Sequence, residues 1–366
     1  MKPKLLCILH RSPPTHGAAK VGDFISESKK LNEKFDCQFI TIKSSNTIGN
    51  IGKINFKKLY LVVKLYIKIF IALIFFRPDK IYFTASINSI AFYRDILLST
   101  LWKCYKLFKK TDIYYHYHTK GINKFVSVSK KNLKLTNFFL KDVNLILLSP
   151  LLKDDFKKID NYKNILYLPN GVENNLTNKE FISYLEEKKF HNINILYLSN
   201  MIKSKGYFEI LKLANLFKNK KYHFHFAGGW QDKEDEKEFF KYIKKNNLEK
   251  IVTFHGFVNG EQKRKLFIDT SLFVFPTRYK NEAFPLTILE SLSYGVPILS
   301  TNEGSIPFIV DEKSGIIVSN LNDLSIELDN AIDNLINKKT SIYCRKRYLK
   351  NFTLDKFENN LVEVFK

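Results

Sequence analysis

Short apolar runs alternate along the chain with longer segments in which apolar residues recur at helical spacing. The runs in the first half are KLLCILH, CQFITI, KIYFTA, IYYHYH, VNLILLS and NILYLPN. Those in the second half are INILYLS, HFHFAG, VTFHGF, LFVFPT, VPILST and GIIVS. Such runs predict buried strands, and the segments between them predict helices. The pattern therefore predicts two parallel sheets, each covered by helices on both faces.

Two strand–helix series predict an α/β protein of two doubly wound, Rossmann-like domains facing a cleft. The length of 366 residues agrees with two domains. We expect an N-terminal domain over 1–168 and a C-terminal domain from 169, with the boundary near Pro169–Gly171. Because open parallel sheets bind ligands at the carboxyl ends of their strands, the cleft is the expected site.

Composition narrows the class of protein. A hydrophobic content of 45% is ample for two cores and excludes a disordered chain. The apolar run Leu5–Leu9 is too short for a signal peptide and fits a first buried strand. The four cysteines, which are scattered along the chain, show no metal-ligand spacing. We therefore expect a cytoplasmic protein.

Charge is distributed unevenly between the two halves. Residues 1–170 hold 30 Lys and Arg against 11 Asp and Glu, whereas 171–366 hold 29 against 25. No zinc-finger, RRM, KH or basic-zipper pattern accompanies the positive charge, so we expect no nucleic-acid partner.

Lysines of the basic half flank apolar helical segments. Segment 56–76 places Lys57, Lys64 and Lys68 on one helical side, and 102–110 is similar. The longest uninterrupted apolar stretch of segment 56–76 is too short to span a bilayer. Two interpretations remain open: ordinary domain helices with solvated lysines, or a peripheral contact with an anionic membrane surface, which the regional charge favours.

Two glutamates bracket a predicted helix start in the segment NEAFPLTILESLSYGVP. Pro285 suits a first helical position, and Gly295 marks the end, so we expect a helix over 285–294. The first amides of that helix would attract a phosphate. Glu282 and Glu290 are suited to bind sugar or ribose hydroxyls. The segment therefore suggests a nucleotide-sugar site.

This E-x7-E segment resembles the signature of retaining GT-B glycosyltransferases of family 4 (glycosyl transferases group 1), of the surface-polysaccharide type. Further segments resemble the family in order along the chain: LPNGVE, LSNMIKSKG, FHFAGGW, VTFHGF, FPTRYKNEAFP and GSIPFIVDEKSGIIV. In that fold the last helix crosses back to the first domain. The resemblance thus implies a C-terminal domain over 169–343 and a helix at 344–366 packed on the N-terminal domain.

The resemblance also implies roles for individual residues. Glu282 contacts the transferred sugar, Glu290 binds the ribose, and Lys205 neutralises the leaving diphosphate. His118, at the mouth of its strand, contacts the sugar and supports the reaction, and Lys120 and Gly121 shape the acceptor side. The other implied donor-binding residues are Gly17, Asn200, Gly256, Val258, Arg278, Ala283, Phe284, Pro285, Leu286 and Thr287.

Some of these positions depart from the family pattern. Asn200 stands where an arginine is common, so Arg278 or Lys203 would supply the second positive charge. Ala283 replaces a common glycine but keeps its amide. In the opening loop, His16 is a neighbour of Gly17. Gly228 and Gly229 open another loop of the cleft.

The sequence lacks a D-x-D triplet and a His/Cys cluster, so we expect no metal and no cofactor beside the nucleotide-sugar co-substrate. The implied function is transfer of a sugar, with retention, from a nucleotide-diphosphate sugar to a saccharide acceptor on polyprenyl diphosphate. This hexosyltransferase would act in bacterial surface polysaccharide or lipopolysaccharide synthesis, peripherally on the inner face of the cytoplasmic membrane. The alternatives are an epimerase or hydrolase of nucleotide sugars, and a non-catalytic basic membrane-surface adaptor.

Overall fold

A computed structural model describes residues 1–13, 17–42 and 56–366. His16 lies outside these residues, as does the side chain of Lys57. The chain divides into two compact units. Unit 1 comprises Met1–Asn170 with Leu354–Lys366, and unit 2 comprises Gly171–Thr353.

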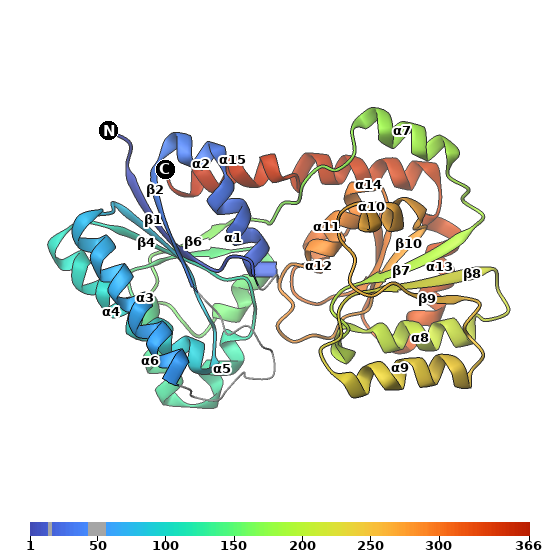
Figure 1. The fold of residues 1–366 in the computed structure, drawn as a ribbon, viewed down its shortest axis with the longest axis horizontal. Coiled ribbons are helices and arrows are strands. Elements are labelled where there is room, and N and C mark those ends of the chain that lie inside the picture. The colour runs from blue at the N-terminus through green and yellow to red at the C-terminus, as the bar shows by residue number, and fades with distance from the viewer. Residues whose placement is uncertain (14–16, 43–55) are drawn as a thin grey trace. The chain divides into compact units, whose positions relative to one another are not determined.

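Unit 1 is built on a six-stranded sheet in the order β2-β1-β3-β4-β5-β6 (Figure 1), in which every neighbouring pair is parallel. Its strands are β1 (Lys4–Leu9), β2 (Asp36–Thr41), β3 (Lys80–Thr84), β4 (Asp112–His116), β5 (Asn144–Leu147) and β6 (Asn164–Tyr167). They coincide with the six apolar runs of the first half. The four inner strands β1, β3, β4 and β5 are almost wholly buried, whereas the edge strands β2 and β6 are partly exposed. Burial on both faces explains why the inner runs are rich in apolar residues.

Helices cover both faces of this sheet (Figure 1). The helical elements of unit 1 are α1 (Gly17–Glu27), α2 (Lys29–Lys34), α3 (Phe56–Phe75), α4 (Ser89–Phe108), α5 (Ile122–Val128), α6 (Lys130–Leu140), the 3-10 helix η2 (Pro150–Phe156) and α15 (Leu354–Val364). Helix α1 approaches β1 closely at Gly22, where an added Cβ would lie 1.8 Å from the carbonyl oxygen of His10. Only glycine fits this contact.

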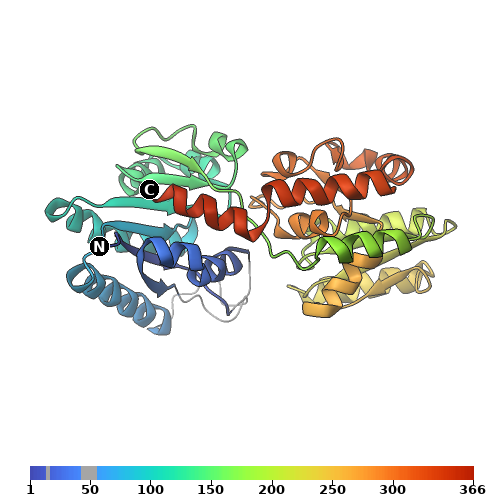
Figure 2. The same cartoon turned by 90° about the horizontal axis from the view of Figure 1, so that it is seen from above.

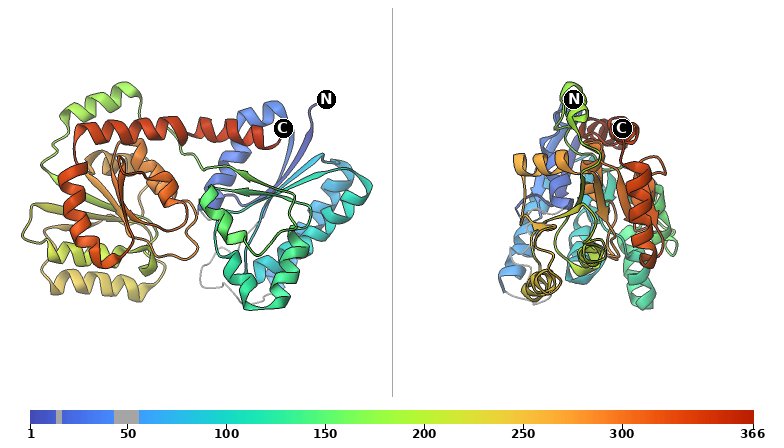
Figure 3. Two further views of the ribbon diagram at one scale, coloured as in Figure 1. Left: turned by 180° about the vertical axis from the view of Figure 1, so that it is seen from behind. Right: turned by 90° about the vertical axis from the view of Figure 1, so that its right-hand side faces the viewer.

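Unit 2 repeats the plan with a second parallel sheet, ordered β12-β11-β10-β7-β8-β9. Figure 3 shows this unit from behind and from the side. The strands are β7 (Ile193–Leu198), β8 (Tyr222–Ala227), β9 (Val252–Phe254), β10 (Leu272–Phe275), β11 (Ile298–Thr301) and β12 (Gly315–Val318). They coincide with the second series of apolar runs. The expected architecture of two doubly wound α/β halves is therefore confirmed.

The helical elements of unit 2 include short 3-10 turns. They are α7 (Asn178–Glu187), η3 (Lys203–Lys205), α8 (Tyr207–Leu216), α9 (Lys233–Lys245), α10 (Gly260–Asp269), α11 (Leu286–Ser293), α12 (Ile306–Ile309), η4 (Leu321–Asp323), α13 (Leu324–Leu335) and α14 (Lys338–Asn351). Helices α8 and α9 lie on one face of the sheet, and α10 and α11 lie on the other (Figure 1).

The C-terminal segment differs from the expected boundary at 343. Residues 344–353 belong to unit 2, because α14 is anchored there by the buried side chain of Arg345. Its guanidinium donates to the carbonyl oxygens of Ser293 and Leu176. Of the C-terminal segment, only α15 and the residues after it belong to unit 1 (Figure 2).

The residue that follows α15, Phe365, is an aromatic anchor in unit 1. The ring of Phe365, which is fully buried, makes edge contacts with Phe35, Tyr82 and Tyr114 at centroid distances of 5.1–6.0 Å. Aromatic burial of this kind stabilises the end of the helix on the sheet.

Candidate functional site

The loops that follow β7, β8 and β9 are tied together at the carboxyl edge of the unit 2 sheet. The amide of Met201 donates to the carbonyl of Gly229, and the amide of Gly228 donates to that of Gly256. Gly228 has φ +150°, and an added Cβ would lie 1.8 Å from the carbonyl oxygen of Ser199. These contacts form a rigid rim where an open parallel sheet binds its ligands.

Lys205 lies on this rim at the end of η3. Its ammonium is 3.2 Å from a carboxylate oxygen of Glu282, and the two side chains are only 17% and 10% exposed. The same ammonium lies 5.8 Å from the ring centroid of Phe275 and 5.3 Å from that of Tyr279. A carboxylate and two aromatic rings thus hold a cation in a largely desolvated position.

The adjacent Gly206 fixes the approach of this turn to the loop after β10. It has φ +89°, and an added Cβ would lie 2.4 Å from the carbonyl oxygen of Pro276. Nearby, the amide of Arg278 donates to the carbonyl of Ser204 at 2.7 Å. The glycine of the K-G pair therefore brings the loop of Lys205 against the loop of Glu282.

The backbone that carries Glu282 is held from two sides. Its amide donates to the carbonyl of Tyr279, and the amide of Ser305 donates to the carbonyl of Ala283, both at 2.8 Å. At Gly304, which has φ +56°, an added Cβ would lie 2.3 Å from the carbonyl oxygen of Glu282. The carboxylate is thus positioned by residues that the sequence marked only as part of the motif GSIP.

Helix α11 begins one residue later than expected. Pro285 is its N-cap residue, with φ −69° and ψ 117°, and the helix runs from Leu286 to Ser293. Proline has no side-chain acceptor for the first amides, so those of Leu286 and Thr287 are not capped by it. Ala283 and Phe284 are buried just before this end. The helix start therefore offers amide donors and a positive dipole end beside Glu282.

Glu290 lies one turn into α11, on the same side as Leu286 and Thr287 because residues three and four apart share a helical face. Its carboxylate accepts from the ammonium of Lys263 on α10 at 2.6 Å, and both side chains are partly buried. Sequence reasoning missed Lys263. The two residues are 27 positions apart, and no local spacing links them.

The candidates for a second positive charge are engaged in other ion pairs. The guanidinium of Arg278 lies 2.5 Å from a carboxylate oxygen of Glu209. The ammonium of Lys203 lies 3.1 Å from Asp235 and 2.7 Å from Glu238 on α9. Both cations are more than half exposed. Asn200 is exposed on the same rim, and its carbonyl accepts from the hydroxyl of Tyr197.

The loop between β9 and α10 contains Gly256 and Val258, two of the residues predicted to bind the donor. Gly256 has φ +66°, a conformation that favours glycine, and Val258 is partly exposed two residues later. The loop ends at Gly260, which begins the helix that carries Lys263. It is thereby connected directly to the Lys263–Glu290 pair.

Two predicted residues, Gly17 and His118, lie in unit 1. Gly17 is the exposed first residue of α1. His118 lies two residues beyond the end of β4, not at the end of the strand as expected. Its ring is 4.0 Å from that of His116, centroid to centroid.

His116 anchors this pair in the core of unit 1. Its Nδ1 is 2.7 Å from the hydroxyl of Tyr82. Burial, and then the neighbouring His118, hold the pKa of His116 well below its usual range. A neutral imidazole therefore packs against the candidate catalytic ring.

Gly121, expected to shape the acceptor side, has a structural partner. The carboxylate of Asp155 accepts from the amides of Gly121, Ile122 and Asn123 at 2.6–3.1 Å. Asp155 thereby caps the start of α5 with a negative charge, which fixes the loop after His118.

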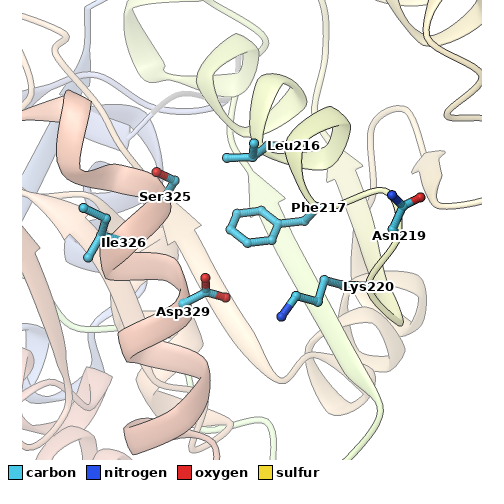
Figure 4. Close-up of a pocket in the computed structure, with 7 residues that line it drawn as sticks. All are labelled: Leu216, Phe217, Asn219, Lys220, Ser325, Ile326 and Asp329. Carbon is cyan, nitrogen blue, oxygen red and sulfur yellow. The ribbon is translucent and has the colours of Figure 1, made fainter.

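A hollow of about 390 Å³ lies elsewhere in unit 2, beside the end of α8 and the start of α13 (Figure 4). It is lined by Leu216, Phe217, Asn219, Lys220, Ser325, Ile326 and Asp329. It adjoins the segment that leads into β8, at the amino edge of the sheet, so the predicted donor residues do not line it.

Within the described parts of the chain, no group of three or more His, Cys, Asp or Glu side chains is arranged to hold a metal ion. The absence of a metal from the reaction stays a prediction.

Comparison with known proteins shows what the chain is similar to. Residues 180–350 match the family model described as glycosyl transferases group 1. Over 158 residues the chain is 31% identical to the O-antigen biosynthesis glycosyltransferase WclY of Escherichia coli, covering 40% of this chain and 41% of that protein. The chain spans less than half the length of the curated relatives it matches.

Solved structures resemble the whole fold. Sucrose-phosphate synthase from Thermosynechococcus elongatus superposes with a TM-score of 0.72 at 15% identity, covering 100% of this chain and 98% of that one. Anabaena HepE, solved with UDP and glucose, gives 0.68 at 15% identity and 99% coverage of both chains. The fold is therefore GT-B. Within residues 180–350, the chain is similar to glycosyl transferases group 1.

Proposed function

We propose that the protein is a retaining glycosyltransferase of family 4 that uses a nucleotide-diphosphate sugar as donor. The observation that carries this proposal is the desolvated Lys205–Glu282 pair on the rim that also carries the start of α11 and Glu290. A diphosphate would compete with Glu282 for the Lys205 ammonium and accept from the amides of Leu286 and Thr287. Glu290, oriented by Lys263, would accept from the ribose hydroxyls.

The proposed chemistry is displacement on one face of the sugar. The bond between the anomeric carbon and the diphosphate oxygen breaks, with its electron pair going to the diphosphate. The acceptor oxygen bonds to the same face, and its proton passes to a diphosphate oxygen. Lys205 and the helix amides stabilise the charge on the leaving group, so neither an enzymic nucleophile nor a metal is required.

The reaction we propose belongs to bacterial surface polysaccharide or lipopolysaccharide synthesis, with a hexosyl group passing to a saccharide on polyprenyl diphosphate. Supporting this placement, the matched relative WclY is named for O-antigen biosynthesis. The protein would then act peripherally on the inner face of the cytoplasmic membrane. His118 would contact the transferred sugar from unit 1.

The test is consumption of nucleotide sugars from a panel, with and without a lipid-linked saccharide acceptor. A transferase releases nucleoside diphosphate only with the acceptor, and the product keeps the anomeric configuration of the donor by NMR. Consumption without acceptor would instead identify a hydrolase or epimerase. A protein that consumes none of the donors under either condition would behave as an adaptor.

A further inference from the structure

Helix α3 has two apolar sides, of which only one packs on the sheet of unit 1. Leu65, Ile69, Ala72 and Leu73 form the buried side. The opposite side carries nine exposed large apolar residues, Phe56, Leu59, Tyr60, Val63, Ile67, Phe70, Ile71, Ile74 and Phe75, each at least 48% exposed. An ordinary domain helix turns polar side chains to water, so the solvated-helix interpretation does not account for this surface.

The exposed surface extends onto the neighbouring helix. Helices α3 and α4 lie side by side on the same face of the sheet (Figure 1). Ile90, Tyr93 and Leu97 of α4 are 47–50% exposed. The two neighbouring helices thus both expose large apolar residues, and a concentration of such residues is of the kind that marks an interaction site. We call it the α3–α4 patch.

The charges around the α3–α4 patch have one sign. Helix α3 contains no Asp or Glu, and its exposed Lys64 and Lys68 flank the apolar row at helical spacing. The single acid of α4, Asp95, is fully buried and paired with Arg94 at 2.7 Å. Neither helix therefore presents a carboxylate to solvent.

The exposed apolar row and the positive charge beside it distinguish between two possible occupants of the patch, a second copy of the chain and an anionic lipid surface. A symmetric pairing with a second copy would bring Lys64 and Lys68 near the same lysines without a carboxylate to neutralise them. An anionic lipid surface satisfies both features, because its acyl boundary accepts the apolar row and its headgroups pair with the lysines. Among the described residues, no helix combines the length and apolar character needed to cross a bilayer.

We propose that the α3–α4 patch docks the protein on an anionic lipid bilayer, with α3 lying in the plane of the interface. This inference deepens the peripheral membrane location in the proposed function and rests on it for the biological setting. Its physical basis is independent of catalysis, because α3 and α4 lie in unit 1 and the donor rim lies in unit 2.

The test is co-sedimentation of the full chain with vesicles, in the absence of donor and acceptor. We expect wild type to bind vesicles of phosphatidylglycerol and phosphatidylcholine, and to be released by salt. The apolar variant Ile67→Gln/Ile71→Gln/Ile74→Gln should bind at least tenfold more weakly. The matched control, Ile182→Gln/Phe240→Gln/Ile326→Gln, changes three exposed apolar residues of unit 2 and should bind like wild type.

The charge variant Lys64→Gln/Lys68→Gln tests the second feature. It should bind anionic vesicles on the order of 30-fold more weakly, at about fivefold for each lysine near the surface. Its control, Lys241→Gln/Lys245→Gln, removes two exposed lysines at the same spacing on α9 and should leave binding unchanged. Circular dichroism establishes that each variant is folded.

Several results would overturn the inference. These are failure of wild type to bind anionic vesicles, equal binding by the apolar variant and its control, or a lipid-free dimer that the apolar variant dissociates. Donor consumption with a soluble acceptor, measured on the same variants, separates this outcome from failure of the proposed function.

Discussion

Lys205 and Glu282 hold opposite charges 3.2 Å apart on the rim of unit 2, beside the first turn of α11. In this largely desolvated place each charge is costly without a partner. A diphosphate and a sugar hydroxyl would provide new partners for the ammonium and the carboxylate. Glu290 is already paired with Lys263, which restricts its orientation. The arrangement of these four side chains predicts that some of them act in donor binding and others in the transfer step.

We expect Glu290→Ala to weaken donor binding and Glu282→Ala chiefly to slow transfer. A hydrogen bond to a charged group contributes about 1.5–3 kcal/mol, which corresponds to a ten- to hundredfold change. Steady-state kinetics separate the two effects, since the first raises KM and the second lowers kcat. Glu186→Ala, at an exposed position on α7, is the control. Wild-type constants in both site variants would disprove the assignment.

Charge neutralisation by an ammonium and helix amides also predicts the response to metal removal. If Lys205 and α11 stabilise the leaving diphosphate, transfer should persist in excess EDTA, because no divalent ion is needed. The measurement compares initial rates before and after chelation. Loss of activity that Mg²⁺ or Mn²⁺ restores would show that a metal performs this task instead.

At the level of the elements, α11 and α14 depend on one buried side chain. Arg345 donates to the carbonyl oxygen of Ser293, at the end of α11, and to the carbonyl oxygen of Leu176. It also donates to the side-chain oxygen of Asn174 at 2.8 Å. A cation at the carboxyl end of a helix complements its dipole. Arg345 therefore holds α11 in place at its carboxyl end, which is opposite the end that lies at the candidate site.

Replacing this guanidinium should destabilise unit 2. Arg345→Met keeps an elongated side chain but removes the donors, at about 1–3 kcal/mol for each buried acceptor left unsatisfied. We expect the melting temperature to fall by several degrees in calorimetry. Lys346→Met changes the adjacent, exposed residue and should have little effect. Equal melting temperatures for the two variants would contradict this role.

A cluster of histidines on β8 and beyond β9 predicts how stability responds to acid. Nδ1 of His225 is 3.0 Å from Nε2 of His255, and the rings of His223 and His225 are 4.6 Å apart. Burial, and then these two neighbours, lower the pKa of His225 to about 4. The pKa values of His223 and His255 are lowered as well, mainly by burial.

In the unfolded chain His225 binds a proton near pH 6.5, whereas in the folded protein it does so only near pH 4. The free energy of unfolding should therefore be highest above about pH 6.5 and should decrease as the pH falls toward 4. Urea unfolding at pH 7.5 and 5.5 measures this decrease. His225→Gln should reduce it, whereas His191→Gln, at an exposed position in unit 2, should not. An identical decrease in wild type and His225→Gln would exclude this cause.

The elements were more predictable than their contacts. Apolar runs identified the twelve strands of the described residues, because buried parallel strands are rich in apolar residues. The proline and glycine around α11 fixed its ends to within one residue. The Lys263–Glu290 pair was not predictable, since it joins distant positions. The second apolar side of α3 was also missed, because periodicity does not distinguish buried apolar residues from exposed ones.

At the level of the whole molecule, the two units carry different features. Unit 2 carries the matched family segment and the charged rim, while unit 1 carries the histidine pair, the α3–α4 patch and most of the excess positive charge. Sequence similarity is thus concentrated in the proposed donor-binding half. The proposed function depends on this half binding a nucleotide sugar through its diphosphate.

Calorimetric titration of nucleoside diphosphates tests that claim most directly. We expect one nucleoside diphosphate to bind per chain, more tightly than the corresponding nucleoside. Binding should be at least tenfold weaker in Lys205→Ala, because a charge-assisted contact with the diphosphate is lost. It should be nearly unchanged in Lys203→Ala, which removes an exposed lysine of the same turn that is paired with α9. Equal affinity for nucleoside and diphosphate, or equal loss in the two lysine variants, would contradict the account.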